Sequence, residues 1–513
     1  MKKILAMLLS CALLTGCTAA PAESTPPQME PVVTEAAKVT GPVVEITLKG
    51  QEISVSGGDG GVFISRDILY YENKTQYDSG LPYGDGEEWE MHSREEAAAH
   101  LVVNITAPGT YRVTGKLDRG QIRVDLGENA ASNPDAVVNL ILDGVEITCT
   151  VAPAIVFQNV YECDGNWSQD KAKPNVDTTA AGANLILAEN SRNTLNGSHV
   201  AKIYQDTEGE KKLWKQDGAV YSYMSLNVYG PGALEINADN EGLDTELHLS
   251  IFGGDITIRS GNDGINTNED GVSVTAIHGG NLRILAGLGE EGDGIDSNGY
   301  LVIYGGNVVS SAHPASDAGL DSDLGSFIHG GTVIALGAPM DWAESESGQV
   351  TMNLQFDQEQ TGALRITRED GTEVFSFDPA TDPVLGENFR SYRGAILSSP
   401  QFRVGDAYLV FAGGTQMAYT GTDVMMGPGG FRPGMGIPED REDMPEPPEG
   451  DVTLPPQPSE GMDPVPQGTL PTGPQGGPPA GPQGNPGQQP GEPRTLFLMA
   501  DAVNFFTGLI PAP

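Results

Sequence analysis

Gly292-Asp-Gly-Ile-Asp-Ser-Asn-Gly299 is the clearest copy of a short motif that occurs four times in the middle of the chain. The other copies are Glu241-Gly-Leu-Asp-Thr-Glu246, Asp263-Gly-Ile-Asn-Thr-Asn268 and Ala318-Gly-Leu-Asp-Ser-Asp323. Glycine pairs that end at Gly254, Gly280, Gly306 and Gly331 alternate with these copies at spacings of 26, 26 and 25 residues. A period of this length is typical of stacked repeats that share one continuous core.

Each repeat unit contains short apolar runs that alternate at period two and are separated by glycine, asparagine or aspartate. No unit has an apolar pattern of helical length and period, and the consensus of leucine-rich repeats is absent. We therefore expect an all-β chain with a right-handed parallel β-helix over residues 43–340. Glycine is expected to turn the chain where a Cβ would clash.

Alternation along a strand predicts which motif side chains face the core. The expected inward residues are Leu243, Ile265, Ile295 and Leu320, together with Thr245, Thr267, Ser297 and Ser322. The residues between them are expected to point outward in two columns. One column contains Asp244, Asn266, Asp296 and Asp321, the other contains Glu246, Asn268, Asn298 and Asp323, and Asp263, Asp293 and Asp317 lie beside them.

Such columns predict a metal site. Neighbouring strands lie about 4.8 Å apart, and two carboxylates at that distance repel by about 3 kcal/mol at an effective dielectric constant of about 20. Oxygen ligands at flexible spacing suit Ca²⁺, so we predict calcium ligands at Asp244, Asp263, Asn266, Asp293, Asp296, Asn298, Asp317, Asp321 and Asp323. The alternative is that each Asp or Asn only fills a turn and caps local backbone groups.

The N-terminus predicts export. Residues 1–16 combine Lys2 and Lys3 with a short apolar run, which is typical of a signal peptide. Leu14-Thr-Gly-Cys17 resembles the bacterial lipobox, which implies cleavage before Cys17, lipidation of its thiol and a membrane lipid anchor. Residues 17–42 are rich in Pro, Ala, Glu and Thr and are expected to be a flexible tether.

The charge balance limits the classes of partner. The chain has 28 basic and 70 acidic residues and a net charge of −42, which becomes −44 when Lys2 and Lys3 leave with the signal peptide. Nucleic-acid binding needs clustered Lys and Arg, so we exclude it. Direct capture of a polyanion is also disfavoured unless a cation bridges the two.

The remaining segments divide the chain further. Residues 341–426 break the period and are expected to form a small antiparallel β-rich cap, because a stack needs a different final unit to close its core. Residues 427–494 are dense in Pro, Gly and Gln and are expected to be disordered. Residues 495–513 are apolar and are expected to pack back as an added strand. Cys149 and Cys163 are either one disulfide or two separate buried thiols.

The chain also resembles a bacterial family of secreted calcium-binding β-helix proteins with carbohydrate-binding domains, related in fold to pectate lyases. The residues that carry the resemblance are Val138–Val145, Asn193–Asn196, Val228–Ile236, Gly292–Gly299, Ile303–Gly306, Ser398–Pro400 and Gly405–Tyr408, within about residues 43–421. It implies binding of plant cell-wall or acidic polysaccharide, with calcium on Asp293, Asp296, Asp317, Asp321 and Asp323. Ala318 departs from the pattern, since the other copies have an acid there.

Three functions follow as hypotheses. The favoured one is a monomeric, lipid-anchored surface protein that holds polysaccharide through Ca²⁺. The second is a polysaccharide lyase acting by β-elimination, for which Arg259 and Arg283 are the weak candidate bases, expected to point outward on one face. The third is a structural or adhesive surface protein.

Overall fold

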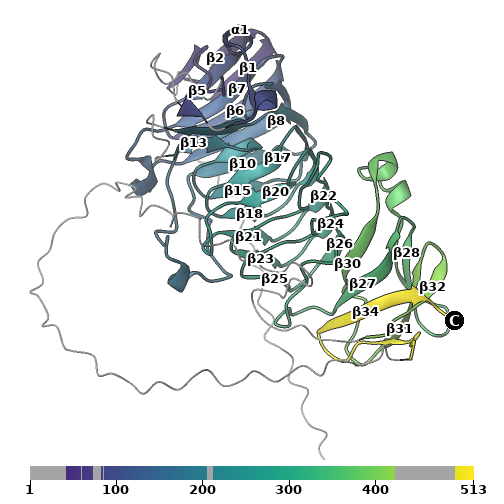
Figure 1. Cartoon of the computed structure of the whole chain (residues 1–513). Helices are drawn as coiled ribbons and strands as arrows, with labels where there is room; N and C mark the ends of the chain where they lie inside the picture. The colour runs from purple at the N-terminus through teal and green to yellow at the C-terminus, as the bar shows by residue number, and fades with distance from the viewer. Residues whose placement is uncertain (1–41, 59–60, 73–82, 85, 205–211, 422–491) are drawn as a thin grey trace, which may run out of the picture.

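The computed structural model describes residues 42–58, 61–72, 83–84, 86–204, 212–421 and 492–513. These residues form an all-β structure with large sheets and few helices, as the sequence predicts (Figure 1). The one α-helix in the described ranges, α1 (Arg94–Ala98), is short and begins at Ser93, whose side chain accepts a hydrogen bond from the Glu96 N–H. No helix in this part of the chain has the length and apolarity needed to span a membrane.

The repeats stack through three columns of parallel strands, and most units add one strand to each column. Column A contains β10 (Ala183–Leu187), β15 (Leu226–Tyr229), β18 (Leu249–Ile251), β21 (Val274–Ile277), β23 (Tyr300–Ile303) and β25 (Gly325–Ile328). Column B contains β11 (Arg192–Gly197), β16 (Ala233–Ala238), β19 (Asp255–Ser260), β22 (Asn281–Leu285), β24 (Asn307–Ser311) and β26 (Thr332–Gly337). Column C contains β5 (Leu101–Ile105), β7 (Gly120–Asp125), β9 (Ile155–Asn159), β14 (Gly218–Ser222), β17 (Glu241–Thr245) and β20 (Ile265–Thr267).

The N-terminal strands continue the stack. β8 (Val138–Thr148) is long enough to pair with β10 through its first half and with β11 through its second half. β6 (Gly109–Leu117) pairs in parallel with β8 and with β1 (Val43–Gly50). At this end β2 (Glu52–Ser56) pairs antiparallel with β1, and β3 (Val62–Ser65) pairs antiparallel with β5.

The register of column C confirms the predicted inward residues. Leu243 pairs with Ile265, which forms a bridge with Ile295 in the next unit. The side chains of Leu243, Ile265, Ile295 and Leu320 all have 0% exposure, as do Thr245, Thr267 and Ser297. Ser322, in the last motif copy, is only half-buried.

Glycine is required at two kinds of place. The second glycine of each pair has a positive φ, such as 91° at Gly280, where a Cβ would lie 2.7 Å from the Gly254 carbonyl oxygen of the preceding unit. The glycine of each motif copy lies against the next unit, since a Cβ on Gly264 would be 2.5 Å from the Gly294 oxygen. The repeated glycines therefore set how closely the units stack.

The C-terminal cap has mostly antiparallel pairing, and its apolar residues form one cluster with Leu285, Val309, Ile334 and Leu336 of column B. Its strands are β27 (Thr351–Gln360), β28 (Leu364–Thr367), β29 (Glu373–Phe377), β30 (Tyr392–Ser398), β31 (Ala407–Ala412) and β32 (Thr415–Ala418). β30 joins the cap to the stack by pairing antiparallel with both β26 and β27. After the segment 422–491, β33 (Phe497–Leu498) and β34 (Val503–Pro511) return to the cap, and β34 pairs in parallel with β27, as expected of an added strand.

Both cysteines of the folded part are free thiols, so the proposed Cys149–Cys163 disulfide is not formed. Cys149 points into the apolar core beyond the end of β8, whereas Cys163 lies in the loop after β9 and contacts the Glu162 carboxylate. Burial raises the pKa of the Cys149 thiol to about 12, which makes it unreactive. The signal peptide, Cys17, nearly all of the tether and nearly all of the 427–494 segment lie outside the described residues.

Candidate functional site: a buried column of carboxylates

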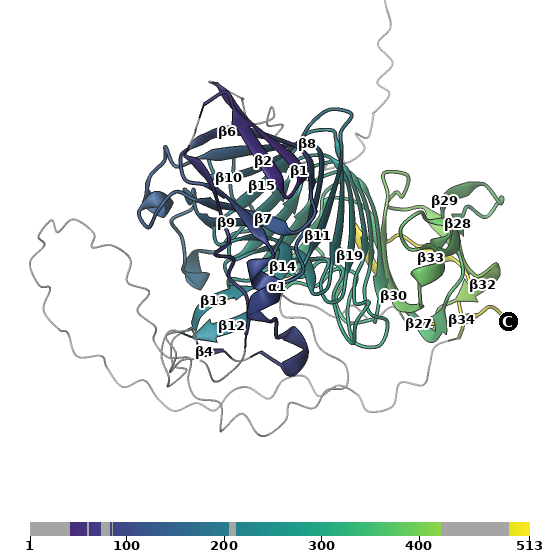
Figure 2. The same cartoon turned by 90° about the horizontal axis from the view of Figure 1, so that it is seen from above.

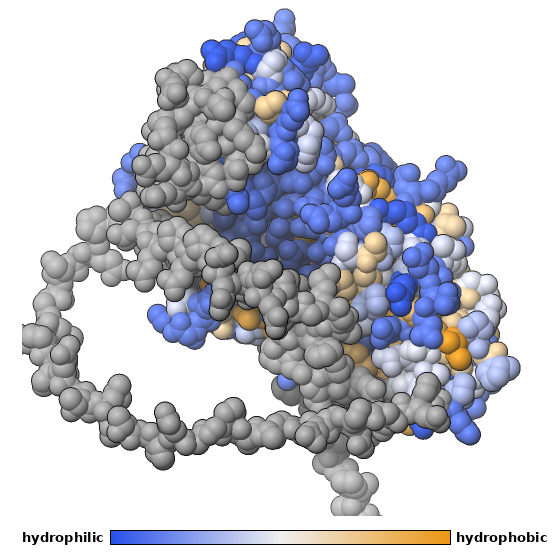
Figure 3. Space-filling model, in the orientation of Figure 1, coloured by the Kyte–Doolittle hydropathy of each residue, from blue (hydrophilic) through white to orange (hydrophobic). Residues whose placement is uncertain are grey.

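The motif carboxylates line one side of the stack along β17, β20 and the turns that continue column C. We use the term carboxylate column for Glu241, Asp244, Asp263, Asp293, Asp296, Asp321 and Asp341. Figure 3 shows a hydrophilic, recessed surface in the middle of the view, where Figure 1 labels β17 and β20. Seen from above, column C lies on the side of the molecule where the short strands β12 (Val200–Tyr204) and β13 (Lys212–Gln216) also lie (Figure 2).

At its start the column meets a further acid, Asp217, which comes from the preceding unit. Ligand oxygens of Asp217, Glu241 and Asp244 all lie within 4.8 Å of one another. Asn266 bridges to the next unit, since its Nδ2 donates to Glu241 Oε1 at 3.2 Å and to Asp263 Oδ2 at 3.4 Å. Glu241 and Asp244 contact each other through their side chains, and Glu241 Oε2, Asp244 Oδ2 and Asn266 Oδ1 are buried and have no hydrogen-bond donor when both acids are ionised. Buried oxygens without a donor are costly, so this arrangement is suited to a cation.

The second part of the column is linked by backbone donors. Asp263 Oδ1 accepts the Asp293 N–H at 2.7 Å, and Asp293 Oδ1 accepts the Ala318 N–H at 2.6 Å. One oxygen of each acid thus accepts a backbone hydrogen bond from the next unit along the chain. Further along, Asp321 and Asp341 share a side-chain hydrogen bond and both accept the Ser322 N–H. Two carboxyl groups in such contact hold one proton or one cation between them.

The electrostatics of the column disfavour full ionisation. Burial and repulsion by Asp321 raise the pKa of Asp296 to about 8, and burial with the Asp321 contact raises the pKa of Asp341 to about 9. Burial, followed by repulsion from neighbouring column members, also raises the pKa of Asp244, Asp263 and Asp293 well above the usual range. The same two causes act on many neighbours at once, which marks the column as a place where negative charge accumulates.

The structure changes the predicted surroundings of the site residues. Asp244 pairs in register with Asn266, which agrees with the predicted column, but Asp244 has 0% exposure. The predicted outward direction does not leave it exposed, because β14 packs directly beside it: a Cβ on Gly218 would lie 2.5 Å from the Asp244 Cβ. Asn268, from the second predicted column, donates to Asp244 Oδ1 at 2.6 Å.

The remaining predicted ligands lie at the margin. Asn298 donates to Asp270 Oδ1 at 3.0 Å, and Asp317 Oδ2 accepts the Gly292 N–H at 3.1 Å. Asp323 is exposed. Asp317 thus accepts a backbone N–H group, as Asp263 and Asp293 do. Its negative charge is also among the causes that raise the pKa of Asp263, after burial and the charge of Glu241.

Three acids at the site were absent from the predicted ligand set. Glu241 occupies the motif position of Asp263 and Asp293, so the repeat itself contains the signal. Asp217 precedes a glycine in the same way, one unit earlier, and its signal is weaker because the rest of that copy has diverged. Asp341 lies beyond the last repeat, and no spacing in the sequence points to it.

The two candidate arginines are not brought to the column. Arg259 and Arg283 lie in column B, where Arg283 pairs in register with Thr257 rather than with Arg259. Arg259 Nη1 lies 2.8 Å from Glu235 Oε1, and Arg283 Nε lies 3.3 Å from Asp382 Oδ2. Both guanidinium groups therefore have carboxylate partners, and both lie on column B rather than on column C, where the carboxylate column lies.

A second stack of side chains lies at the turns between columns A and B. We use the term aromatic ladder for Tyr229, Phe252, His278, Tyr304 and His329, each next to a glycine turn. Successive ring centroids are 4.7, 4.6, 4.9 and 5.6 Å apart, and the rings are close to parallel. Burial lowers the pKa of His278 to about 4, so the ring is neutral in the stack.

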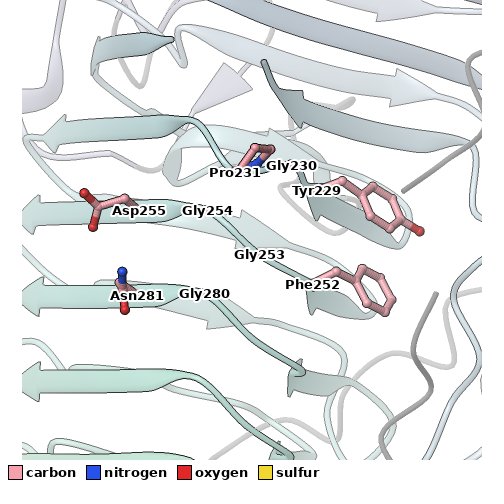
Figure 4. Close-up of a pocket in the computed structure, with 9 residues that line it drawn as sticks. All are labelled: Tyr229, Gly230, Pro231, Phe252, Gly253, Gly254, Asp255, Gly280 and Asn281. Carbon is pink, nitrogen blue, oxygen red and sulfur yellow. The ribbon is translucent and has the colours of Figure 1, made fainter. Parts of the chain in front are cut away.

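A shallow groove of about 460 Å³ lies beside the first rungs of this ladder. Figure 4 shows the Tyr229 and Phe252 rings one above the other, with Gly253, Gly254 and Gly280 between them and the side chains of Asp255 and Asn281. The ring faces are occupied by one another, so the groove presents ring edges and a flat glycine floor. It lacks the donor-free buried oxygens of the carboxylate column.

Comparisons with known proteins point to carbohydrate-binding domains. Residues 100–352, which include columns A to C, match a family model described as a carbohydrate-binding domain-containing protein. A protein of that description from Acetivibrio thermocellus is 32% identical over 159 residues, which is 31% of this chain. The match spans 45% of that relative, so the chain covers less than half of its length.

Among solved structures, the chain is similar to the polysaccharide lyase-like protein from C. thermocellum, studied as a gadolinium derivative. The identity is 23% and the TM-score is 0.35, with 56% of this chain and 93% of that chain covered.

Proposed function

We propose that this protein binds polysaccharide through calcium ions held on the carboxylate column. The observation that carries the proposal is the set of buried, donor-free oxygens on Glu241, Asp244 and Asn266, from two successive units. Calcium takes six to eight oxygen ligands at about 2.3–2.6 Å in flexible geometry, and carboxylate and amide oxygens are suitable ligands. The family model that matches residues 100–352 supports a carbohydrate as the ligand.

The charge of the chain favours an acidic glycan bound through the metal. A net charge of −42 repels uronate carboxylates. Calcium on the column would neutralise the protein carboxylates and leave coordination positions for those of the sugar. An acidic, plant cell-wall type of polysaccharide is therefore the substrate class that we propose.

We also propose the setting in which this binding occurs. The three columns of parallel strands support a right-handed parallel β-helix as the architecture. The N-terminal signal and the Leu14-Thr-Gly-Cys17 sequence support export and lipid anchoring at Cys17, with the folded part on the outer face of a membrane. In this position a glycan-binding surface would hold polysaccharide at the cell.

The test is a binding assay with the purified chain from Thr18 onward, which leaves out the signal peptide and the lipidated Cys17. Polygalacturonate and a neutral glucan are compared, each with Ca²⁺ and with EDTA, and the absorbance of unsaturated uronates is followed in the same samples. We expect polygalacturonate to bind only with Ca²⁺, with flat absorbance.

A matched pair of variants sharpens the assay. Asp293→Asn with Asp321→Asn removes two charges from the column while keeping the oxygens that accept backbone N–H groups. Asp255→Asn with Asp143→Asn removes two charges from sites outside the column. Calcium-dependent binding should be lost only in the first pair. Equal binding of polygalacturonate in Ca²⁺ and EDTA would overturn the proposal.

A further inference from the structure

Lys215 lies at the first part of the carboxylate column and is the last lysine of the chain. Its ammonium group contacts the Asp217 carboxylate, and its Nζ donates to Asn268 Oδ1 at 3.3 Å. The side chain comes from β13, which pairs antiparallel with β12. Strand β13, which lies outside the repeat, thus places one positive charge at the start of the carboxylate column.

The ammonium group is surrounded by acids of several units. Burial lowers the pKa of Lys215, but the nearby carboxylates of Glu241 and Asp244 more than reverse this effect, and the pKa is raised above its ordinary value. Glu246 and Asp263 act in the same direction. Lys215 is therefore charged, and it is the only lysine or arginine for which the described residues show such a set of column neighbours.

One ammonium group does not satisfy this part of the column. Ligand oxygens of Asp217, Glu241 and Asp244 lie within 4.8 Å of one another, and when Glu241 and Asp244 are both ionised, Glu241 Oε2 and Asp244 Oδ2 have no donor. Asn266 Oδ1, from the next unit, is a further buried oxygen without a donor. The neutral amide oxygen and the two carboxylate oxygens show that the space is built for a cation with more ligands than Lys215 uses.

Tyr221 closes this end of the column. It pairs in register with Asp244, and its hydroxyl group donates to the Glu246 carboxylate. The position that precedes Asp244 in the column is thus an aromatic ring rather than an acid. A divalent cation that uses Asp217 together with Glu241 and Asp244 meets the Lys215 ammonium group, which already contacts the Asp217 carboxylate, and two cations at such a distance repel strongly.

We propose that the Lys215 ammonium is a built-in counter-ion of the Asp217–Glu241–Asp244–Asn266 group, and that a divalent cation binds this group only by displacing it. The inference rests on the proposed function and deepens it. It divides the column into one site from which Lys215 must first be displaced, which we call the lysine-guarded site, and the sites from Asp263 to Asp341, where Lys215 need not be displaced. Displacement would also release the contact that ties β13 to the column. Calcium binding there would loosen the small sheet of β12 and β13.

The test compares Lys215→Met with wild type in the full mature chain. Calcium binding is measured by titration calorimetry, and Tb³⁺ luminescence sensitised by tyrosine reports the site beside Tyr221 and Tyr223. Lys202→Met, which removes an exposed lysine from β12, is the matched control. We expect Lys215→Met to bind Tb³⁺ beside the tyrosines at least about tenfold more tightly than wild type, because a competing charge is gone. Lys202→Met should match wild type.

Two further variants keep the inference falsifiable if Lys215→Met folds poorly without metal. Lys215→Gln is expected to show the same gain, and Lys215→Arg, which keeps the charge, is expected to resemble wild type. Hydrogen exchange of the β12 and β13 amides should rise in wild type when Ca²⁺ is added. Equal affinity of wild type, Lys215→Met and Lys215→Gln for the tyrosine-sensitised site would overturn the inference.

The two proposals fail in different ways. If calcium supports polygalacturonate binding in every variant but Lys215 has no effect on metal affinity, only the lysine-guarded site is overturned. If Lys215→Met gains the metal site and polygalacturonate binds neither protein, the carbohydrate proposal is overturned and the lysine-guarded site stands. If no variant binds a divalent cation, both are overturned.

Discussion

The carboxylate column and the aromatic ladder are two stacks built by the same repeat, but they differ in what holds them together. Each ring of the ladder lies on the next at 4.6–5.6 Å, and both partners gain from the contact. The acids stack with the same register, yet they repel, and several buried oxygens have no donor. The ladder is complete without a ligand, whereas the column requires a cation or protons.

This difference indicates which stack of a repeat protein is suited to binding a ligand. A stack that satisfies itself adds to stability and leaves little for a ligand. A stack with like charges loses stability in the free protein, and it regains stability when a ligand of opposite charge binds. The following experiments test whether the two stacks behave in these opposite ways.

Removal of divalent cations should give the largest effect. A ligand that binds only the native state at 100 times its Kd stabilises it by about 2.7 kcal/mol per site. We therefore expect EDTA at pH 8 to lower the Tm by about 3 °C for each occupied site relative to excess Ca²⁺. Differential scanning calorimetry measures the shift. Asp293→Asn with Asp321→Asn should reduce it, and an equal Tm in both buffers would show that the column binds no cation.

The pH dependence in EDTA should be the next largest effect. The pKa of Asp296 rises from its ordinary value of 3.8 to about 8 in the folded protein, and that of Asp341 to about 9. Between these limits the native state holds more protons than the unfolded state, so the free energy of unfolding falls as pH rises from about 4 to about 9. Urea denaturation at a series of pH values measures this slope.

Calcium should flatten that slope, because the cation replaces the protons. Asp296→Asn with Asp341→Asn is the control, and it should reduce the slope in EDTA. Stability that rises with pH across the same range in EDTA would contradict the assigned charge state of the column.

Breaking the ladder should give a smaller loss that does not depend on calcium. Phe252→Ala removes the ring between Tyr229 and His278 and should cost about 2–3 kcal/mol, somewhat less than for a fully buried phenylalanine. Phe252→His, which repeats a residue already used in the ladder, should cost less. Urea denaturation in Ca²⁺ and in EDTA should give the same difference from wild type. A calcium-dependent difference would mean that the two stacks are coupled.

Replacing Arg259 should give the smallest effect. Its pair with Glu235 is partly exposed, so Arg259→Gln should change the free energy of unfolding by less than about 1 kcal/mol. Polygalacturonate binding should be unchanged, since the arginine lies in column B. If wild type produced unsaturated uronates and Arg259→Gln did not, the lyase hypothesis would replace the binding proposal.

The repeat made much of this structure predictable. The period, the glycine pairs and the alternation predicted the β structure, the inward residues from Leu243 to Leu320 and the register of Asp244 with Asn266. They could not predict the burial of Asp244, because that depends on how β14 packs beside it. Asp341 was also beyond reach, since it comes from a segment outside the period and meets Asp321 only through the fold.

The ladder was hidden for a different reason. Its rungs are Tyr, Phe or His, so no single residue type repeats at the position. What the five residues share is a flat ring next to a glycine turn, and that property appears only when the units are aligned by register. The free thiols at Cys149 and Cys163 are a similar case, because the sequence gives their number and not the direction in which each side chain points.

The return of β34 to the cap has a consequence for how the chain can be divided. Tyr419 and Arg494 exchange backbone hydrogen bonds on either side of residues 422–491, and Phe497 and Phe506 pack with Tyr419 in the cap core. A single protease cut within 422–491 would therefore yield two fragments that stay associated. The C-terminal fragment would behave as a separable strand that completes the cap in trans, so this protein can serve as the basis of a fragment-complementation pair.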